Sequence, residues 1–374
     1  MQKEVKMITK KIIVDQSYYN DKVKRLGEVI RAGGLVAFPT ETVYGLGGNA
    51  LDKEAAKKIY MAKGRPSDNP LIVHVADISE VSTYVKRILP LEKRLMEAFW
   101  PGPLTIVFPK KDIVPMATSG GLRTIAIRCP AHEAARALIR AAGVPIAGPS
   151  ANISTKPSPT TADAVLHDMD GRIEFVIDGG DSLIGLESTV IAVENGKIII
   201  YRPGGITRDM LEAFAPTELD TAITAEQEHP KAPGMKYRHY APKADLSIVE
   251  GAEEKAPGMK YRHYAPSAPL TVYAGNIEAV ESEILSFANK GKGKFGFFVS
   301  QETAEKIPAG NIIFVWGRRG NKKELAHNLF QGLLFFNNHP VDHIIGEGTD
   351  GGGIGMAIMN RLTKASGTHI INMN

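Results

Sequence analysis

The chain has very little cysteine. Cys129 is the only cysteine among 374 residues, which excludes internal disulfides and any cysteine-rich metal site. No apolar run approaches the roughly 20 residues that a membrane-spanning helix needs. The charged start MQKEVKMITKKIIVD contains no apolar segment typical of a signal peptide. We therefore expect a soluble, cytoplasmic protein without a membrane partner.

Several catalytic and nucleotide-binding motifs are also missing. The chain has no G-x-x-x-x-G-K-[ST] loop, no G-x-S-x-G elbow and no H-E-x-x-H motif. No set of histidine, cysteine and carboxylate residues has zinc-site spacing. The glycine-rich stretch GTDGGGIGMA at 348–357 does not have the spacing of the dinucleotide fingerprint. Cys129 ends a predicted strand beside Pro130, which argues against covalent catalysis through its thiol.

The composition is that of an ordinary globular protein. Hydrophobic residues make up 43% and charged residues 23% of the chain, which excludes disordered and fibrous classes. A chain of this length can build two domains, each with its own core. The formal charge of +4 permits an anionic substrate but does not by itself argue for nucleic acid.

Short β-rich runs alternate with helix-like stretches over the first 200 residues or so. We expect strands at 35–39, 71–76, 104–109, 124–129, 145–149, 175–180, 188–194 and 197–204. We expect helices at 21–32, 53–63, 91–99 and 132–141, and a short helical piece after Gly205. This alternation predicts an α/β or α+β domain built around a mixed, twisted sheet.

A second alternating pattern begins near residue 270. Strands are predicted in PLTVYAG, KFGFFVS, NIIFVWG and DHIIGEG, and helices at 277–289, 324–337 and 355–364. Strands that alternate with helices favour a small doubly wound, Rossmann-like domain of roughly 100 residues. The stretch TELDTAITAEQEHP between the two patterns lacks apolar periodicity and is expected to be a linker.

One twelve-residue segment occurs twice. KAPGMKYRHYAP spans 231–242 and again 255–266. The segment is too polar for a core, and its prolines prevent a long helix. It offers cations and aromatic rings in consecutive positions, so it is suited to lie on a flat, anionic partner. An inert expansion of a tolerant loop is the alternative.

Two loops carry side chains suited to phosphate or nucleotide. In KGRPSDNPL, Lys63 and Arg65 lie close enough to point positive charge at one anion, and Asn69 can hydrogen-bond a base or ribose. The prolines keep this loop open, with backbone N–H groups expected to be free. In GPSANIS and the following residues, small residues let a ligand approach, and polar groups come from Ser150, Asn152 and Ser158. Taken alone, each stretch is more often an ordinary solvated turn.

Polar residues also follow or lie on predicted strands. In FPTETVYGLGGNA, Thr40, Glu41 and Thr42 precede a glycine-rich stretch expected to be a flexible loop. Thr124 and Arg128 are four apart on one strand and therefore face the same side. An arginine on the buried side needs an anion or a carboxylate partner. Ser188 in GLESTVI and Arg202 in YRPGG complete the set.

Taken in order, these motifs resemble the L-threonylcarbamoyladenylate synthases, in the long two-domain Sua form with a YrdC-type catalytic domain. The matching series is FPTETVYGLG, KGRP with NPL, PSAN followed by SPT, GLESTVI, RPG and PGMKYRHYAP, and it covers essentially the whole chain. The resemblance implies a YrdC-like catalytic domain over 1–215, a linker or lid over 216–269, and a Rossmann-like C-terminal domain over 270–374.

The resemblance also implies a reaction: condensation of L-threonine, bicarbonate and ATP to threonylcarbamoyl-AMP and pyrophosphate, for later modification of tRNA. It makes Lys63 and Arg65 catalytic. It implies that ATP is bound by Arg65, Asn69, Thr124, Ser150, Asn152, Ser158, Arg202 and Tyr240. It implies that L-threonine is bound by Thr42, His74, Arg128, Gly148 and Ser188, with Thr40 as the alternative to Thr42. Mg²⁺ is expected with ATP, with no metal-ligating residue and no organic cofactor in the protein. The expected partners are a downstream tRNA-modifying transferase complex and tRNA.

The family carries the PGMKYRHYAP motif once, whereas this chain carries it twice. We expect the first copy, with Tyr240, rather than the second, with Tyr264, to close over ATP. Two other functions stay open. The first is an RNA-binding module without adenylation activity, although the net charge is modest. The second is a carbamoyl-adenylate enzyme that serves another acceptor, as in hydrogenase-maturation carbamoyltransferases, although their zinc-finger and acylphosphatase-like parts are missing here.

Overall fold

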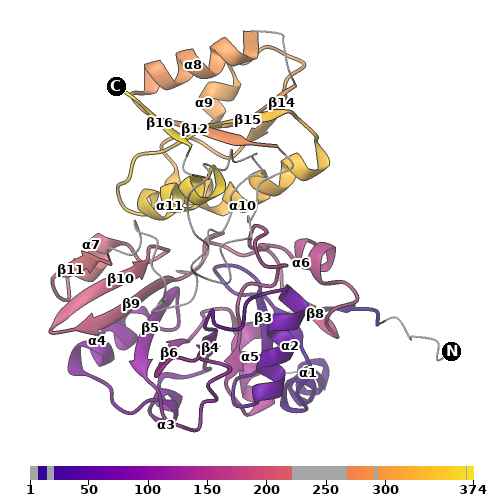
Figure 1. Ribbon diagram of the computed structural model, residues 1–374, viewed down its shortest axis with the longest axis vertical. Coiled ribbons are helices and arrows are strands. Elements are labelled where there is room, and N and C mark those ends of the chain that lie inside the picture. The colour runs from indigo at the N-terminus through magenta and orange to yellow at the C-terminus, as the bar shows by residue number, and fades with distance from the viewer. Residues whose placement is uncertain (1–6, 15–20, 221–267, 290–293, 368) are drawn as a thin grey trace, which may run out of the picture. The chain divides into compact units, whose positions relative to one another are not determined.

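A computed structural model describes residues 7–14, 21–220, 268–289, 294–367 and 369–374. The described residues form two compact units, one that contains nearly all of those up to residue 220 and one that contains those from residue 268 on (Figure 1). Both copies of the repeated segment lie outside the described residues. In the part of the chain that is described, no helix is long and apolar enough to cross a membrane.

The N-terminal unit alternates strands with helices, as the sequence predicts. Its strands are β1 (Lys10–Ile13), β2 (Val36–Phe38), β3 (Gly45–Asn49), β4 (Ile72–His74), β5 (Leu104–Pro109), β6 (Thr124–Arg128), β7 (Ile146–Ala147), β8 (Phe175–Asp178), β9 (Thr189–Glu194), β10 (Lys197–Arg202) and β11 (Thr217–Leu219). Its helices are α1 (Asp21–Arg31), α2 (Lys53–Lys63), the 3₁₀ turn η1 (Ile78–Glu80), α3 (Val81–Tyr84), α4 (Pro90–Phe99), α5 (Glu133–Ala142), α6 (Ala162–Met169) and α7 (Arg208–Glu212).

These strands form one mixed sheet in the order β1-β8-β2-β3-β7-β4-β6-β5-β9-β10-β11. The sheet contains parallel pairs, such as β4 with β6, and antiparallel pairs, such as β5 with β6. The predicted mixed sheet is therefore confirmed. Strand β11 extends this sheet beyond residue 215, where the sequence pattern predicts a linker.

Helix α2 shows how local signals position a functional side chain. Asp52 caps its start by accepting a hydrogen bond from the Glu54 amide, and Gly64 ends it in the left-handed conformation with φ of 60°. A glycine adopts that conformation without strain, so the helix stops at this point. The last helical residue, Lys63, is thereby fixed where the chain turns away from the helix.

The glycine-rich stretch after Thr42 is a strand and not the flexible loop that its composition suggests. Strand β3 pairs antiparallel with β2, opposite Val36–Phe38, and all but its last residue are buried. A Cβ at Gly45 would stand 2.8 Å from the Phe38 ring, and one at Gly47 would stand 2.9 Å from the Val36 carbonyl oxygen. The glycines are therefore required by close packing within the sheet.

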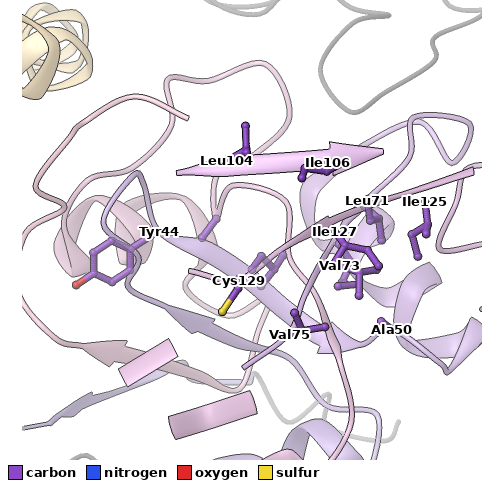
Figure 2. Close-up of a cluster of buried hydrophobic side chains, with 14 of the residues drawn as sticks. Tyr44, Ala50, Leu71, Val73, Val75, Leu104, Ile106, Ile125, Ile127 and Cys129 are labelled. Carbon is purple, nitrogen blue, oxygen red and sulfur yellow. The ribbon is translucent and has the colours of Figure 1, made fainter. Parts of the chain in front are cut away.

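A large apolar cluster lies against the central strands (Figure 2). Figure 2 shows side chains from β4, β5 and β6 gathered there, among them Val73, Ile106 and Ile127, with Tyr44 nearby. Cys129 belongs to the same cluster and is 1% exposed. This core supports β4 and β6, which carry the candidate site residues His74, Thr124 and Arg128.

The C-terminal unit is a five-stranded parallel sheet in the order β14-β13-β15-β12-β16. Figure 1 shows α8 and α9 on one face of this sheet and α10 and α11 on the other, which confirms the predicted doubly wound fold. Its strands are β12 (Leu270–Gly275), β13 (Phe295–Val299), β14 (Ile312–Val315), β15 (His343–Glu347) and β16 (Ile370–Met373). Its helices are α8 (Ile277–Asn289), α9 (Gln301–Ala304), α10 (Lys322–Asn338) and α11 (Gly355–Ala365).

Candidate active site

The buried side chain of Arg128 contacts the buried turn that follows β2, at residues 40–42. Arg128 at the end of β6 donates from Nη1 to Thr42 Oγ1 at 2.8 Å and from Nε to the Gly102 carbonyl at 3.2 Å. Its Nη2 lies 2.8 Å from Glu41 Oε1 without hydrogen-bond alignment, so this contact is an ion pair. The Arg128 and Glu41 side chains are only 4% and 8% exposed. The carboxylate partner that a buried arginine requires is therefore Glu41.

Thr40 and Thr42 share one hydrogen bond. Their Oγ1 atoms are 2.8 Å apart. Thr40 Oγ1 donates its one proton to the Val43 carbonyl at 2.6 Å, so Thr42 is the donor in the hydrogen bond between the two threonines. The hydrogen bonds of the Thr40 hydroxyl thus stay within its own turn, whereas the Thr42 hydroxyl also accepts a hydrogen bond from Arg128. Both side chains are buried, and the contact with Arg128 favours Thr42 as the one that reaches a ligand.

His74 faces the same region from the neighbouring strand. It pairs with Arg128 across β4 and β6. Its Nδ1 is buried without a hydrogen-bond partner in the described structure. Burial, reinforced by the Arg128 charge, lowers the pKa of His74 to about 3, so the ring is neutral. A Cβ at Gly148 would stand 3.0 Å from this Nδ1, so glycine at 148 avoids a close contact with the nitrogen.

Lys63 turns inward rather than toward solvent. Its Nζ donates to the carbonyl oxygens of Ser150 at 2.5 Å and of Asn152 at 2.6 Å. The residue is 1% exposed. Burial, and secondarily the charge of Arg65, lowers the pKa of the Lys63 ammonium well below its ordinary value. The sequence predicts the proximity of this lysine to an anion but not its two carbonyl contacts.

Arg65 folds over the loop that follows α2. It donates from Nη2 to Asn69 Oδ1 at 2.5 Å and to the Pro70 carbonyl at 3.1 Å. Asn69 is 1% exposed, and its Nδ2 has no partner within the described ranges. The expectation of free backbone amides here is wrong for four of them, because the amides of Gly64, Arg65, Asn69 and Leu71 donate to backbone carbonyls. The unpartnered side-chain amide of Asn69 is the better candidate ligand contact.

A third group lies near β9 and β10. Arg202 donates from Nε to the Ser188 carbonyl at 3.0 Å and from Nη2 to Ser188 Oγ at 3.1 Å. Ser188 Oγ also lies 2.7 Å from Thr105 Oγ1. One residue before Ser188, the Glu187 carboxylate accepts from Ser158 Oγ at 2.6 Å. Two hydrogen-bonded groups, one of Arg202, Ser188 and Thr105 and the other of Ser158 and Glu187, therefore meet at the adjacent residues 187 and 188.

Backbone contacts join the first two groups. Gly45 forms an isolated bridge with Ser150, and the Ala151 amide donates to the Tyr44 carbonyl at 2.9 Å. The turn that carries Thr42 therefore runs beside the segment that holds Lys63. Thr124 lies half-buried at the start of β6, without a side-chain contact to these residues, and Tyr240 lies outside the described residues.

Sequence reasoning did not assign a role to Glu41, Thr105 or Glu187, which contact Arg128, Ser188 and Ser158 respectively. The need of a buried arginine for a carboxylate was the one signal that pointed to Glu41. Cys129 is no nucleophile, because burial raises its thiol pKa to about 12.

Family models match both units. A Sua5/YciO/YrdC model described as "Telomere recombination" matches residues 28–204. A model described as "Threonylcarbamoyl-AMP synthase, C-terminal domain" matches 206–256 and again 250–367. The first of these two stretches contains the first copy of the repeated segment and the second contains the other copy, in keeping with a local duplication.

Relatives of similar length match the chain nearly end to end. A threonylcarbamoyl-AMP synthase of Bacillus subtilis is 42% identical over 96% of this chain and 97% of its own length. One of Pyrococcus abyssi is 43% identical over 94% and 96%. A structure described as P. abyssi Sua5 complexed with L-threonine superposes with a TM-score of 0.85 at 40% identity, over 98% of this chain and 100% of that one. The chain belongs to the threonylcarbamoyl-AMP synthase family, in its two-domain form.

Proposed function

We propose that this protein is an L-threonylcarbamoyladenylate synthase, which converts L-threonine, bicarbonate and ATP to threonylcarbamoyl-AMP and pyrophosphate. The observation that carries the proposal is the near-complete match, at 40% identity, to the P. abyssi structure described with bound L-threonine. The buried polar groups around Arg128 and Lys63 support the same reaction.

L-threonine would bind beside Arg128. The guanidinium is a fork suited to a carboxylate and is held in place by Glu41 and Thr42. The neutral His74 ring offers an unused nitrogen to the substrate hydroxyl. Glycine at 148 leaves room beside that nitrogen. Ser188 adds a hydroxyl on the side of Arg202.

ATP would bind along the Lys63 and Arg65 side. The Asn69 amide and the backbone around Ser150 are suited to the nucleoside, and Lys63 and Arg65 to the phosphates. Ser158 and Arg202 extend this set toward Ser188. Asn152, Thr124 and Tyr240 remain in the proposed ATP set on the family resemblance, with Tyr240 on a lid.

The chemistry needs no protein nucleophile. The amine of threonine and bicarbonate form a carbamate with loss of water, and a carbamate oxygen then attacks the α-phosphorus while pyrophosphate leaves. The residues of this site would align the reactants and offset the negative charge that builds up on the phosphates. Because a carbamate is labile in water, a lid that excludes solvent would raise the yield.

Mg²⁺ would enter as the complex with ATP. The described residues contain no group of three histidine, cysteine or carboxylate side chains placed to hold a metal ion. The triphosphate itself supplies oxygen ligands that Mg²⁺ prefers. The product would pass to a tRNA-modifying transferase complex, with tRNA as the final acceptor.

Pyrophosphate release tests the proposal directly. ATP is incubated with the protein and Mg²⁺, and threonine or bicarbonate is omitted in turn. Release that requires both supports the synthase. Release without threonine would remove threonine as the substrate. Tight, salt-sensitive tRNA binding without any release would favour an RNA-binding module instead.

A further inference from the structure

The hydroxyl group of Thr105 has one hydrogen-bond partner among the residues that the structure describes. Thr105 lies on β5, is 0% exposed, and its Oγ1 is 2.7 Å from Ser188 Oγ. Neither Thr105 nor Ser188 has any further side-chain partner in the described structure except Arg202, which donates to Ser188 Oγ at 3.1 Å. Three side chains from β5, the start of β9 and the end of β10 thus form one short chain of hydrogen bonds.

The two hydroxyl protons in this series of hydrogen bonds can be placed by asking which acceptor is available to each. In either orientation one buried proton has no acceptor among the described residues: that of Thr105 if Ser188 donates, and that of Ser188 if Thr105 donates. A buried donor without an acceptor is costly. Because the proposed function places bound L-threonine beside Ser188, the orientation in which Thr105 donates gives the remaining proton an acceptor, and Ser188 Oγ then accepts from both Thr105 and Arg202. A hydroxyl has two acceptor sites and one proton, so the Ser188 proton is directed elsewhere.

The next residue shows the contrast. Thr189 Oγ1 donates to the Ile206 carbonyl at 2.6 Å and accepts from the Ile206 amide at 2.9 Å. Its donor and acceptor functions are both used within the fold, as expected of a structural hydroxyl. Ser188, with both acceptor sites used and its proton unassigned, has the pattern of a hydroxyl that is poised to donate to a ligand.

From this pattern we infer that Thr105 is a positioning residue, which turns the Ser188 hydroxyl into a hydrogen-bond donor toward an acceptor oxygen of bound L-threonine. The inference rests on the proposed function for the identity of the ligand. Thr105 touches no substrate itself. It acts by occupying the one Ser188 acceptor site that Arg202 leaves open, which stops the hydroxyl from rotating away.

Three substitutions test this role. Thr105→Val keeps the shape of the side chain and removes its proton, whereas Thr105→Ser keeps the proton. Thr9→Val is the matched control, because Thr9 is also buried and donates to the Met169 and Ile173 carbonyls, just before β1, the strand at one edge of the same sheet. The readouts are the KM for threonine, the KM for ATP, kcat and Tm.

Thr105→Val is expected to raise the threonine KM about fivefold to twentyfold, with kcat within about twofold. Thr105→Ser should restore the KM, and Thr9→Val should lower Tm without changing the KM. An unchanged threonine KM in a folded Thr105→Val protein would overturn the inference. So would a KM rise of equal size in Thr9→Val.

A thermal-unfolding comparison gives a second, independent test. In Ser188→Ala the Thr105 hydroxyl loses its acceptor, so adding Thr105→Val should leave Tm unchanged or raise it. A further fall in Tm would show another partner for Thr105 and refute the proton assignment. This comparison needs no catalysis. If wild-type protein shows no threonine-dependent pyrophosphate release, the proposed function fails, while the Tm comparison still tests whether the Thr105 hydroxyl depends on Ser188 for its hydrogen bond.

Discussion

Replacing Glu41 by glutamine removes one charge from a buried ion pair and changes little in shape. Arg128 and Glu41 are 2.8 Å apart and almost fully buried. The other Glu41 oxygen accepts from the Ala131 amide at 3.1 Å, a contact that a glutamine oxygen can keep. The substitution therefore isolates the charge that balances Arg128.

The expected loss in the free energy of unfolding is large for a substitution that only replaces a carboxylate oxygen by an amide nitrogen. Removing one partner from a buried ion pair typically costs about 3–5 kcal/mol, because the remaining charge is left without compensation. Glutamine retains a dipole toward Arg128, so we expect a loss near the lower end, about 3 kcal/mol. Urea unfolding at neutral pH, with a constant slope m, measures this change in the free energy of unfolding.

A surface pair provides the matched control. Arg208 and Glu212 are 2.7 Å apart, but both side chains are more than 40% exposed. Glu212→Gln should therefore cost less than about 1 kcal/mol. Saturating L-threonine should recover more stability in Glu41→Gln than in wild type, since its carboxylate would compensate Arg128. A Glu41→Gln loss no larger than that of the control would refute the reasoning.

Three further outcomes are expected. Lys63→Met should lower kcat/KM for pyrophosphate release by roughly 10²–10³-fold, because a fixed cation near the phosphates is lost; a fall below tenfold would contradict this role. The pKa of His74 is about 3 in the folded protein and 6.5 without burial. As pH falls, His74 is therefore protonated in the unfolded chain before it is protonated in the folded protein, so the free energy of unfolding decreases below pH 6.5. Between pH 6 and pH 5, the free energy of unfolding, measured with urea, should fall by about 1.2 kcal/mol more in wild type than in His74→Gln. Equal losses would refute the lowered pKa of His74. Tyr240→Ala should weaken ATP binding, measured by calorimetry, more than Tyr264→Ala; the reverse order would assign the lid to the second copy of the repeat.

Elements with strong local signals are predicted well from the sequence. Helix α2 begins and ends where the periodicity places it, at Lys53–Lys63, because Asp52 and Gly64 cap it. Helix α8 likewise matches the predicted range 277–289. Helix α6 was missed: its only clear signal is the cap at Thr161, and only part of its surface is buried.

Strand β3 shows the limit of local reasoning. Glycine has low strand propensity, so the stretch resembles a loop until the partner strand is known. The need for glycine comes from the Phe38 ring and the Val36 backbone, which contact it only after β2 and β3 pair. Such a requirement is tertiary and leaves no periodic pattern.

The candidate site likewise has features that the sequence predicts and features that depend on tertiary structure. Sequence motifs name Lys63, Arg128 and Ser188, but they do not show which atoms these residues contact. The requirement that Arg128 meet a carboxylate follows from burial alone, whereas the choice of Glu41 depends on the pairing of distant strands. Lys63 shows this most clearly, because its immediate partners are backbone carbonyls that no side-chain pattern encodes.

The long loops between partner residues have a consequence for synthesis of the chain. Thr42 and Arg128 are 86 positions apart, Lys63 and Asn152 are 89, and Thr105 and Ser188 are 83. A nascent polypeptide on the ribosome cannot complete any of these contacts until the later partner has emerged, and Arg202 comes last of all. Premature termination or slow translation before that point should therefore yield only inert chains with uncovered apolar strands, which chaperones would have to shield.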